Sequence, residues 1–252
     1  MKGKQINYSN VNKGFRSIGF EWPLNKYQVL IFLDLVFSSV LCPCVTLANF
    51  EEVERFFLVS VFFCCLGGVA YYWIRTSIAD PTDPIVKANR NAILNNTPFE
   101  SSRYENMCTV CTTSVGYNSK HCGTCNRCVH NFDHHCIWLN NCIGYNNYHL
   151  FIKLIIVLFL YECTIVTICV KLLVNYNKGD LGNIEGLESI GVLIFLIVQS
   201  AALIIFLLNL IILHAWLYKK GISTYEFIKS RREKKEKRGS SVVPDPGNTA
   251  LE

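Results

Sequence analysis

Four long apolar blocks constrain the fold of this chain more than any other feature of its sequence. They cover residues 27–47, 56–74, 154–170 and 190–218, and the second and fourth contain no Asp, Glu, Lys or Arg. About 20 apolar residues in a helix cross a hydrocarbon core of roughly 30 Å, so each block predicts a membrane-spanning helix. Only 17% of the 252 residues are charged, against about 25% in a soluble domain. This excludes an ordinary soluble globular protein.

The distribution of Lys and Arg predicts how these helices are oriented, because short segments rich in basic residues stay on the cytoplasmic side. Of the 24 Lys and Arg residues, 20 lie before the first block, between the second and third, or after the fourth, without counting Lys153, which directly flanks the third block. We therefore expect both termini and the middle segment to be cytoplasmic, in a multi-pass protein of the endoplasmic reticulum, the Golgi or the plasma membrane. The net charge of +5 then reflects sidedness, and no nucleic acid partner is expected.

The middle segment carries an unusual concentration of metal-binding residue types. Seven of the 13 cysteines fall within 35 residues, and four histidines lie among them. Several of the cysteines are separated by two residues, a spacing that lets two thiolates reach one tetrahedral zinc ion. Cytoplasmic thiols stay reduced, so zinc is favoured over a disulfide framework. The residues are Cys108, Cys111, Cys122, Cys125, Cys128, Cys136, Cys142, His121, His130, His134 and His135.

The number of candidate ligands exceeds the number that zinc needs. Two closed tetrahedral sites take eight ligands, so some of these residues are spare, and a spare Cys beside a spare His is a candidate nucleophile with its base. In the run Asp133-His134-His135-Cys136, adjacent side chains point in different directions. One histidine can bind zinc while the other serves the thiol, with Asp133 orienting the ring. The spacing leaves open which histidine does which.

Residues 108–151 resemble the cysteine-rich domain of the DHHC protein S-acyltransferases, the membrane palmitoyltransferases. They match C-x2-C-x9-H-C-x2-C-x2-C-x4-D-H-H-C-x5-C-x4-N-x3-F at every specified position. By this resemblance, Cys136 is the nucleophile, His134 its base and Asp133 the carboxylate that orients the base. The resemblance also implies two structural zinc ions, one bound by Cys108, Cys111, His121 and Cys128 and the other by Cys122, Cys125, His135 and Cys142.

Two further motifs resemble those of the family, each with one departure. Ser223-Thr224-Tyr225-Glu226 is similar to Thr-Thr-x-Glu, and Thr224 is expected near Asp133 as its support. Asp80-Pro81-Thr82 is similar to Asp-Pro-Gly. If that turn needs a positive φ at position 82, threonine would strain it.

The implied reaction is protein S-palmitoylation in two steps. Cys136 attacks the thioester of an acyl-CoA, expected to be palmitoyl-CoA, and keeps the acyl group as an enzyme thioester. A cysteine of a cytosolic or membrane-associated protein then removes it. His134 is needed as a base because a free thiol, with a pKa of about 8.5, is mostly protonated in the cytosol.

The acyl chain is expected to lie among the apolar helices. Trp138 and Phe151 are candidates for the entrance of its pocket. Tyr161 lies ten residues past Phe151, about 15 Å deeper at 1.5 Å per residue, so its hydroxyl is a candidate limit on chain length. An ordinary packed tyrosine is the alternative.

The predicted organisation has five parts around these sites. They are a cytoplasmic N-terminus (1–26), a first transmembrane hairpin (27–74), a cytoplasmic segment (75–149) with the zinc domain at about 106–149, the third and fourth helices (150–218) and a basic tail (219–252). The expected fold class is an α-helical polytopic membrane protein with the two-zinc domain between its second and third helices. The basic run 229–238 is a solvated flank or a contact for anionic lipid of the bilayer.

Other functions account for fewer of these features. A non-catalytic zinc adaptor needs only the eight ligands, and a zinc-finger ubiquitin ligase needs no spare Cys–His pair. Asp34 and Glu162 lie inside predicted helices. An intramembrane carboxyl is a candidate functional group, and interhelical hydrogen bonding is the simpler explanation for both.

The predicted orientation has a direct test in glycosylation. The two Asn-x-Ser/Thr sequons begin at Asn7 and Asn95, and charge sidedness puts both in the cytoplasm, away from the glycosylation machinery. We expect no shift in gel mobility after endoglycosidase treatment of the protein expressed in cells. An endoglycosidase-sensitive glycan on either asparagine would contradict the orientation.

Overall fold

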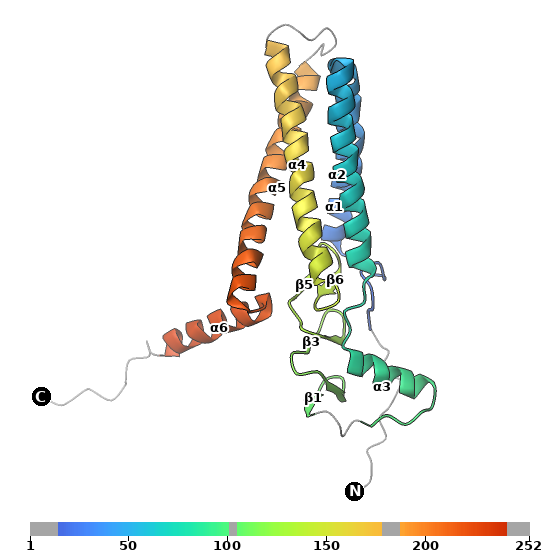
Figure 1. Ribbon diagram of the computed structural model, residues 1–252. Helices are drawn as coiled ribbons and strands as arrows, with labels where there is room; N and C mark the ends of the chain where they lie inside the picture. Colours follow the sequence, from blue (N-terminus) through green and yellow to red (C-terminus); the bar gives the residue numbers. More distant parts are fainter. Residues whose placement is uncertain (1–14, 101–104, 178–186, 241–252) are drawn as a thin grey trace, which may run out of the picture.

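The computed structural model describes residues 15–100, 105–177 and 187–240. Four helices in this part of the chain lie alongside one another and are long and apolar enough to cross a membrane (Figure 1). They are α1 (Lys26–Asn49), α2 (Glu52–Ile78), α4 (Tyr148–Asn177) and α5 (Leu187–Lys220). Their order and number agree with the four apolar blocks. The prediction of a polytopic helical membrane protein with a cysteine-rich domain between its second and third membrane helices is confirmed.

The helices are longer than the apolar blocks that predict them. The last turn of α2 continues to Ile78, and α4 already begins at Tyr148. Thr76 and Ser77 of this turn are completely buried, because the cysteine-rich domain covers them. With 34 residues, α5 is about 51 Å long, which exceeds a hydrocarbon core of roughly 30 Å. These helices can therefore project from the membrane and support the domain at their ends.

The segment between α2 and α4 contains a short helix and three antiparallel hairpins. The helix is α3 (Pro84–Leu94), and the hairpins are β1 (Asn106–Cys108) with β2 (Thr113–Val115), β3 (Lys120–Cys122) with β4 (Arg127–Val129), and β5 (His134–Cys136) with β6 (Asn141–Ile143). A pair of three-residue strands is too short to be stable alone. The hairpins therefore depend on cross-links between them, which the clustered Cys and His side chains can supply through metal.

Asp83 ties α3 to the hairpins. One carboxylate oxygen caps the helix by accepting from the N–H groups of Ile85 and Val86, with Pro84 at the first helical position, as is typical of a helix start. The other oxygen accepts from the N–H of Gly116 at 2.9 Å. The side chain of Asp83 is completely buried, so a single carboxylate fixes both the start of α3 and the loop after β2.

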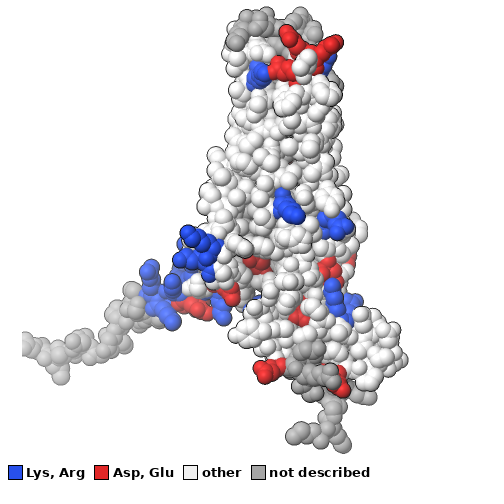
Figure 2. Space-filling model, in the orientation of Figure 1, with Lys and Arg blue, Asp and Glu red and all other residues white. Residues whose placement is uncertain are grey.

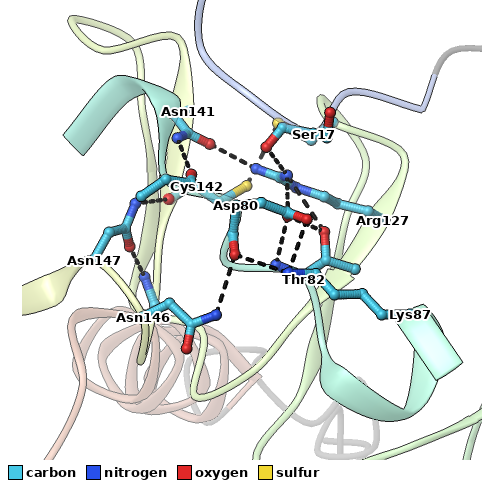
Figure 3. A network of polar contacts seen from close by, with 12 residues as sticks. Ser17, Asp80, Thr82, Lys87, Arg127, Asn141, Cys142, Asn146 and Asn147 are labelled. Carbon is cyan, nitrogen blue, oxygen red and sulfur yellow. Dashed lines mark hydrogen bonds and ion pairs between the residues drawn. The ribbon is translucent and has the colours of Figure 1, made fainter. Parts of the chain in front are cut away.

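Arg127 joins the cysteine-rich domain to the membrane helices through a buried polar network (Figure 3). Its guanidinium donates to the Ser17 carbonyl at 2.6 Å, to Asp80 Oδ1 at 3.1 Å and to Asn141 Oδ1 at 2.6 Å. Asn141 in turn donates to three carbonyls at the end of α2, those of Thr76, Ser77 and Ala79. The last carbonyls of a helix have no partner within the helix. This network therefore satisfies the end of α2 and attaches the domain to it.

Thr82 occupies its turn without the strain that a positive φ would cause. It is not among the residues with positive φ, and its N–H donates to Asp80 Oδ1 at 2.9 Å. Burial opposes ionisation of Asp80, but hydrogen bonds from Thr82 and Lys87 hold its pKa below the ordinary value. Threonine in place of glycine is thus accommodated, because this turn uses the threonine side chain and needs no left-handed backbone.

The basic tail forms a helix that the sequence analysis did not predict, α6 (Thr224–Ser240). It leaves the bundle at the end that carries the cysteine-rich domain (Figure 1). Figure 2 shows a long uncharged band over the bundle and basic side chains gathered over α6. Of the two sequons, Asn95 is exposed at the end of α3, while Asn7 lies outside the described residues.

Candidate active site and metal centres

The first candidate metal centre gathers the four residues that the resemblance implies for one zinc. The ligand atoms of Cys108, Cys111, His121 and Cys128 lie within 4.8 Å of one another. His121 Nδ1 is 3.2 Å from Cys111 Sγ and 3.9 Å from Cys128 Sγ, and the two sulfur atoms are 3.6 Å apart. His121 and Cys128 are directly opposed across the β3–β4 hairpin. Pairing within one hairpin thus supplies two of the four ligands.

The second candidate centre has the same plan. It is formed by Cys122, Cys125, His135 and Cys142. His135 Nδ1 lies 3.4 Å from Cys125 Sγ and 3.7 Å from Cys142 Sγ, and the sulfur atoms of Cys125 and Cys142 are 3.5 Å apart. His135 and Cys142 are directly opposed across the β5–β6 hairpin.

Both sets fit a tetrahedral zinc ion. A Zn–S distance of about 2.3 Å implies sulfur atoms roughly 3.8 Å apart in a regular tetrahedron, and the observed separations are 3.5 and 3.6 Å. The neighbouring thiol of Cys128 lowers the pKa of Cys111 to about 6, and that of Cys125 lowers the pKa of Cys122. Thiolates are the form that binds zinc. Each set can therefore hold one metal ion, and its four side chains complete a tetrahedral coordination shell.

The alternation of side chains along β3 and β5 decides which of two adjacent residues faces which metal set. Successive side chains of a strand point to opposite faces. On β3, His121 therefore faces one centre and Cys122 the other. On β5, His135 faces the second centre, whereas His134 and Cys136 lie together on the opposite face. The structure thus places His135, and not His134, beside the sulfur atoms of Cys125 and Cys142.

His134 is held between a carboxylate and a thiol. Its Nδ1 lies 2.7 Å from Asp133 Oδ2, and the side chain of Cys136 interacts with the same ring. Asp133 and Cys136 are only 5% and 7% exposed, so this group is largely shielded from water. The arrangement is that of a nucleophile, a base and a residue that orients the base.

The start of α6 supports Asp133. Thr224 donates its backbone N–H to Asp133 Oδ1 at 2.8 Å. Ser223 and Glu226 form a capping box, in which each side chain accepts from the backbone N–H of the other. Because the N-terminus of a helix carries partial positive charge, this position favours the ionised carboxylate. Thr224 is thus where the sequence predicted it, and the contact is made by its backbone.

Gly221 makes the turn that returns the chain from α5 to Asp133. Its φ is +66°, a left-handed conformation that glycine adopts without steric cost. The N–H of Gly221 donates to the Tyr218 carbonyl, and that of Ile222 donates to the Leu217 carbonyl. This pattern ends a helix and reverses the chain.

The charge states of His134 and Asp133 follow from the contacts of the two side chains. Burial alone would lower the pKa of His134, but the hydrogen bond to Asp133 and the side chain of Cys136 raise that pKa to about 9. Burial likewise opposes ionisation of Asp133, while His134 and the Thr224 N–H hold its pKa below the ordinary value. The ring is therefore a strong proton acceptor beside a carboxylate that stays ionised.

An apolar cavity of about 480 Å³ opens beside Cys136 and His134. Trp138 and Phe151, the residues expected at its entrance, both line it. The cavity runs between all four membrane helices, and its volume is within the roughly 300–1,000 Å³ of typical ligand pockets. The rest of its lining is His135, Ile137 and Leu139, with Ile31, Leu35, Val69, Trp73, Leu154, Ile155, Leu158, Leu203, Phe206, Leu207 and Leu210 from the helices.

Tyr161 is not among the lining residues of this cavity. It is completely buried on α4, about one helical turn beyond Leu158, the deepest lining residue of that helix. Its hydroxyl is hydrogen-bonded to Ser38 at 2.8 Å, which joins α4 to α1. The side chain therefore lies behind the end of the cavity, and its effect on chain length stays a prediction.

A second, more polar cavity of about 390 Å³ lies between β5 and α6. Asp133 and His134 line it, and His134 thus borders both cavities. The other lining residues are Phe132, His135, Tyr225, Ile228, Lys229, Arg232, Glu233 and Glu236. The ring of His134 therefore separates an apolar space among the helices from a polar space outside them.

Sequence reasoning missed several residues around the site. Arg127 and Asn141 hold the domain on α2, and the signal for Arg127 was a charged residue inside the metal-binding motif. His130, which was a candidate ligand, belongs to neither metal set and instead packs on Tyr145 at 5.3 Å between ring centroids. His214 of α5 lies near His134, and its signal was the one imidazole in the fourth apolar block.

Comparison with known proteins agrees with this geometry. The model of the DHHC palmitoyltransferase family matches residues 101–231. Human palmitoyltransferase ZDHHC11 is 28% identical over 90% of this chain and 63% of its own length, so the chain spans less than two thirds of that relative. The human probable palmitoyltransferase ZDHHC11B is 27% identical over 90% of this chain and 70% of its own length. An Arabidopsis thaliana relative, probable protein S-acyltransferase 20, is 36% identical over 52% of this chain and 20% of its own length.

The family match covers more than half of the chain and includes both metal sets, Asp133, His134 and Cys136. The chain therefore belongs to the DHHC palmitoyltransferase family.

Proposed function

We propose that this protein is a protein S-palmitoyltransferase, which moves a long acyl chain from acyl-CoA to Cys136 and then to cysteines of substrate proteins. The observation that carries the proposal is the position of the Asp133–His134–Cys136 group. His134 and Cys136 lie on the face of β5 that is free of metal ligands and line an apolar cavity between membrane helices, and Asp133, just before β5, contacts His134. A metal-binding adaptor or a ubiquitin ligase would have no use for this group.

The first step transfers the acyl group to the enzyme. His134 takes the proton of Cys136, and the thiolate attacks the carbonyl carbon of the thioester. A new carbon–sulfur bond forms at Cys136, the bond to CoA breaks, and the CoA sulfur leaves with the proton from His134. Asp133 keeps the ring oriented and stabilises its positive charge. The acyl chain occupies the apolar cavity during this step.

The second step repeats the chemistry with a protein thiol. The substrate cysteine gives its proton to His134 and attacks the Cys136 thioester, and Cys136 leaves as a thiol. We place its approach in the polar cavity between β5 and α6, because that cavity reaches His134 from outside the helices. Its charged rim comes from α6, so the flanking residues of a substrate peptide would meet Arg232 and Glu236.

The metal ions in this account are zinc, and they are structural. Each would be held by three thiolates and one histidine, a set that suits zinc. When bound, zinc supplies cross-links between hairpins that are too short to be stable alone. Asp133, His134 and Cys136 do the chemistry.

The proposed function also includes an orientation in the membrane, a lipid contact and a limit on acyl-chain length. The active site and both termini face the cytoplasm, as the distribution of basic residues indicates. The exposed basic side chains of α6 contact anionic lipid, each contributing about 1 kcal/mol near such a surface. Tyr161, braced by Ser38, limits chain length at the far end of the cavity.

The division between ligands and nucleophile predicts different zinc contents for two cysteine variants. Cys125→Ala removes a ligand, so the purified protein should lose one of its two zinc ions and much of its stability, because metal binding and folding are coupled. Cys136→Ser should keep both zinc ions. Elemental analysis of the detergent-purified proteins measures this. Loss of zinc from Cys136→Ser would mean that Cys136 is a ligand and would contradict the assignment.

The first chemical step predicts label on the enzyme itself. Purified protein given labelled palmitoyl-CoA, with no protein substrate, should acquire a hydroxylamine-sensitive label, and Cys136→Ala should acquire none. His134→Ala should slow labelling by roughly 10² to 10⁴-fold, the range for a general base.

The neighbouring histidine is the matched control for this experiment. His135→Ala should lose zinc and fold poorly, because His135 faces the second metal set. A folded, zinc-replete and active His135→Ala protein would contradict the assignment of the two histidines. Label that persists on a well-folded Cys136→Ala protein would contradict the proposed nucleophile.

A further inference from the structure

We propose that His214 of α5 is a positioning residue that holds the ring of His134 in place for the acyl transfer. This inference rests on the proposed function, since it assigns a role within that reaction. His214 belongs to neither metal set and does not line either of the two cavities described above. Its burial and its contacts therefore need another explanation.

The ring of His134 contacts two other rings, each from a different membrane helix. The ring of His134 lies 5.2 Å from Phe151 of α4 and 6.1 Å from His214 of α5, between centroids. Phe151 and His214 are themselves 5.2 Å apart, at an interplanar angle of 69°. With Asp133 bound to Nδ1, these two rings restrict how the imidazole can rotate. The nitrogen that remains free, Nε2, is the one available to the thiol on the same face of β5.

The orientation of His214 is itself fixed. Its side chain is 3% exposed, and a buried imidazole is costly unless it is hydrogen-bonded. Its Nδ1 is 3.1 Å from the hydroxyl of Tyr148, at the start of α4. This bond gives the buried ring a polar partner and sets the angle at which it meets His134.

The contact from His214 complements the support that Thr224 gives. Thr224 follows His214 by ten residues through the Gly221 turn, and its N–H binds Asp133. The α5–α6 unit therefore contacts both members of the pair, the carboxylate through Thr224 and the ring through His214. A single continuous piece of chain can thus fix the direction in which His134 faces Cys136.

A positioning role predicts an effect on rate without an effect on acyl-CoA binding. In single-turnover labelling of the full-length protein with palmitoyl-CoA, His214→Ala should slow acylation of Cys136 at saturating acyl-CoA by roughly 10- to 100-fold, since small misplacements of a reacting group have effects of that size. The KM for palmitoyl-CoA and the zinc content should stay unchanged. His214→Phe keeps a ring beside His134 but loses the bond to Tyr148, so it should recover part of the rate and be faster than His214→Ala. Ile212→Ala, at a position 57% exposed on the same helix, is the matched control and should equal the unmodified protein.

A double substitution tests whether His214 acts through His134. In a His134→Ala background, His214→Ala should cause no further loss, because interacting residues are not additive. The proposal is overturned if His214→Ala changes the rate less than twofold, if it changes only KM, if His214→Phe is as slow as His214→Ala, or if the two losses are fully additive. Failure of the unmodified protein to acquire label would instead contradict the proposed function itself.

Discussion

The alternation of side chains along short strands is the constraint on which the site depends. Adjacent residues of β5 point to opposite faces, so His135 joins the second metal set while His134 and Cys136 are left together. The same rule sends His121 and Cys122 of β3 to different centres. Two metal ions can therefore cross-link the hairpins without using the thiol of Cys136, the proposed nucleophile. A shift of one residue in the pairing of β5 would exchange the two histidines and place His134 among the sulfur atoms.

The hairpins are held at the ends of the membrane helices because they are attached to them at several points. Arg127 and Asn141 dock the domain on the end of α2, and α4 begins a few residues after β6. On the other side, the Gly221 turn brings Thr224 back to Asp133. The Asp133–His134–Cys136 group thus lies where helix ends meet, with an apolar cavity among the helices on one side of His134 and a polar cavity on the other. This position suits the proposed reaction, in which the acyl chain of the donor is apolar and the acceptor thiol approaches from outside the helices.

The parts of this structure that could be predicted from the sequence are those set by local pattern. Apolar length predicted the four helices, and the spacing of cysteines predicted metal. The assignment of His134 and His135 needed the strand geometry of β5, because spacing alone treats the two residues alike. The contact of Arg127 with Asp80 joins residues 47 positions apart, and that of His214 with Tyr148 joins residues 66 positions apart, which no local pattern reveals. The helix α6 was missed although its capping box, Ser223 to Glu226, was present, because the basic run that follows it has no apolar periodicity.

Native mass spectrometry of the intact protein after incubation with palmitoyl-CoA tests the central claim most directly, because it counts zinc and acyl groups on the same molecule. If Cys136 is free of metal, the acylated protein should carry one acyl group and still hold two zinc ions, and peptide mapping should locate the acyl group on Cys136. An acylated species that has lost a zinc ion, or an acyl group on one of the eight ligand residues, would contradict the separation of nucleophile from ligands on which this account rests.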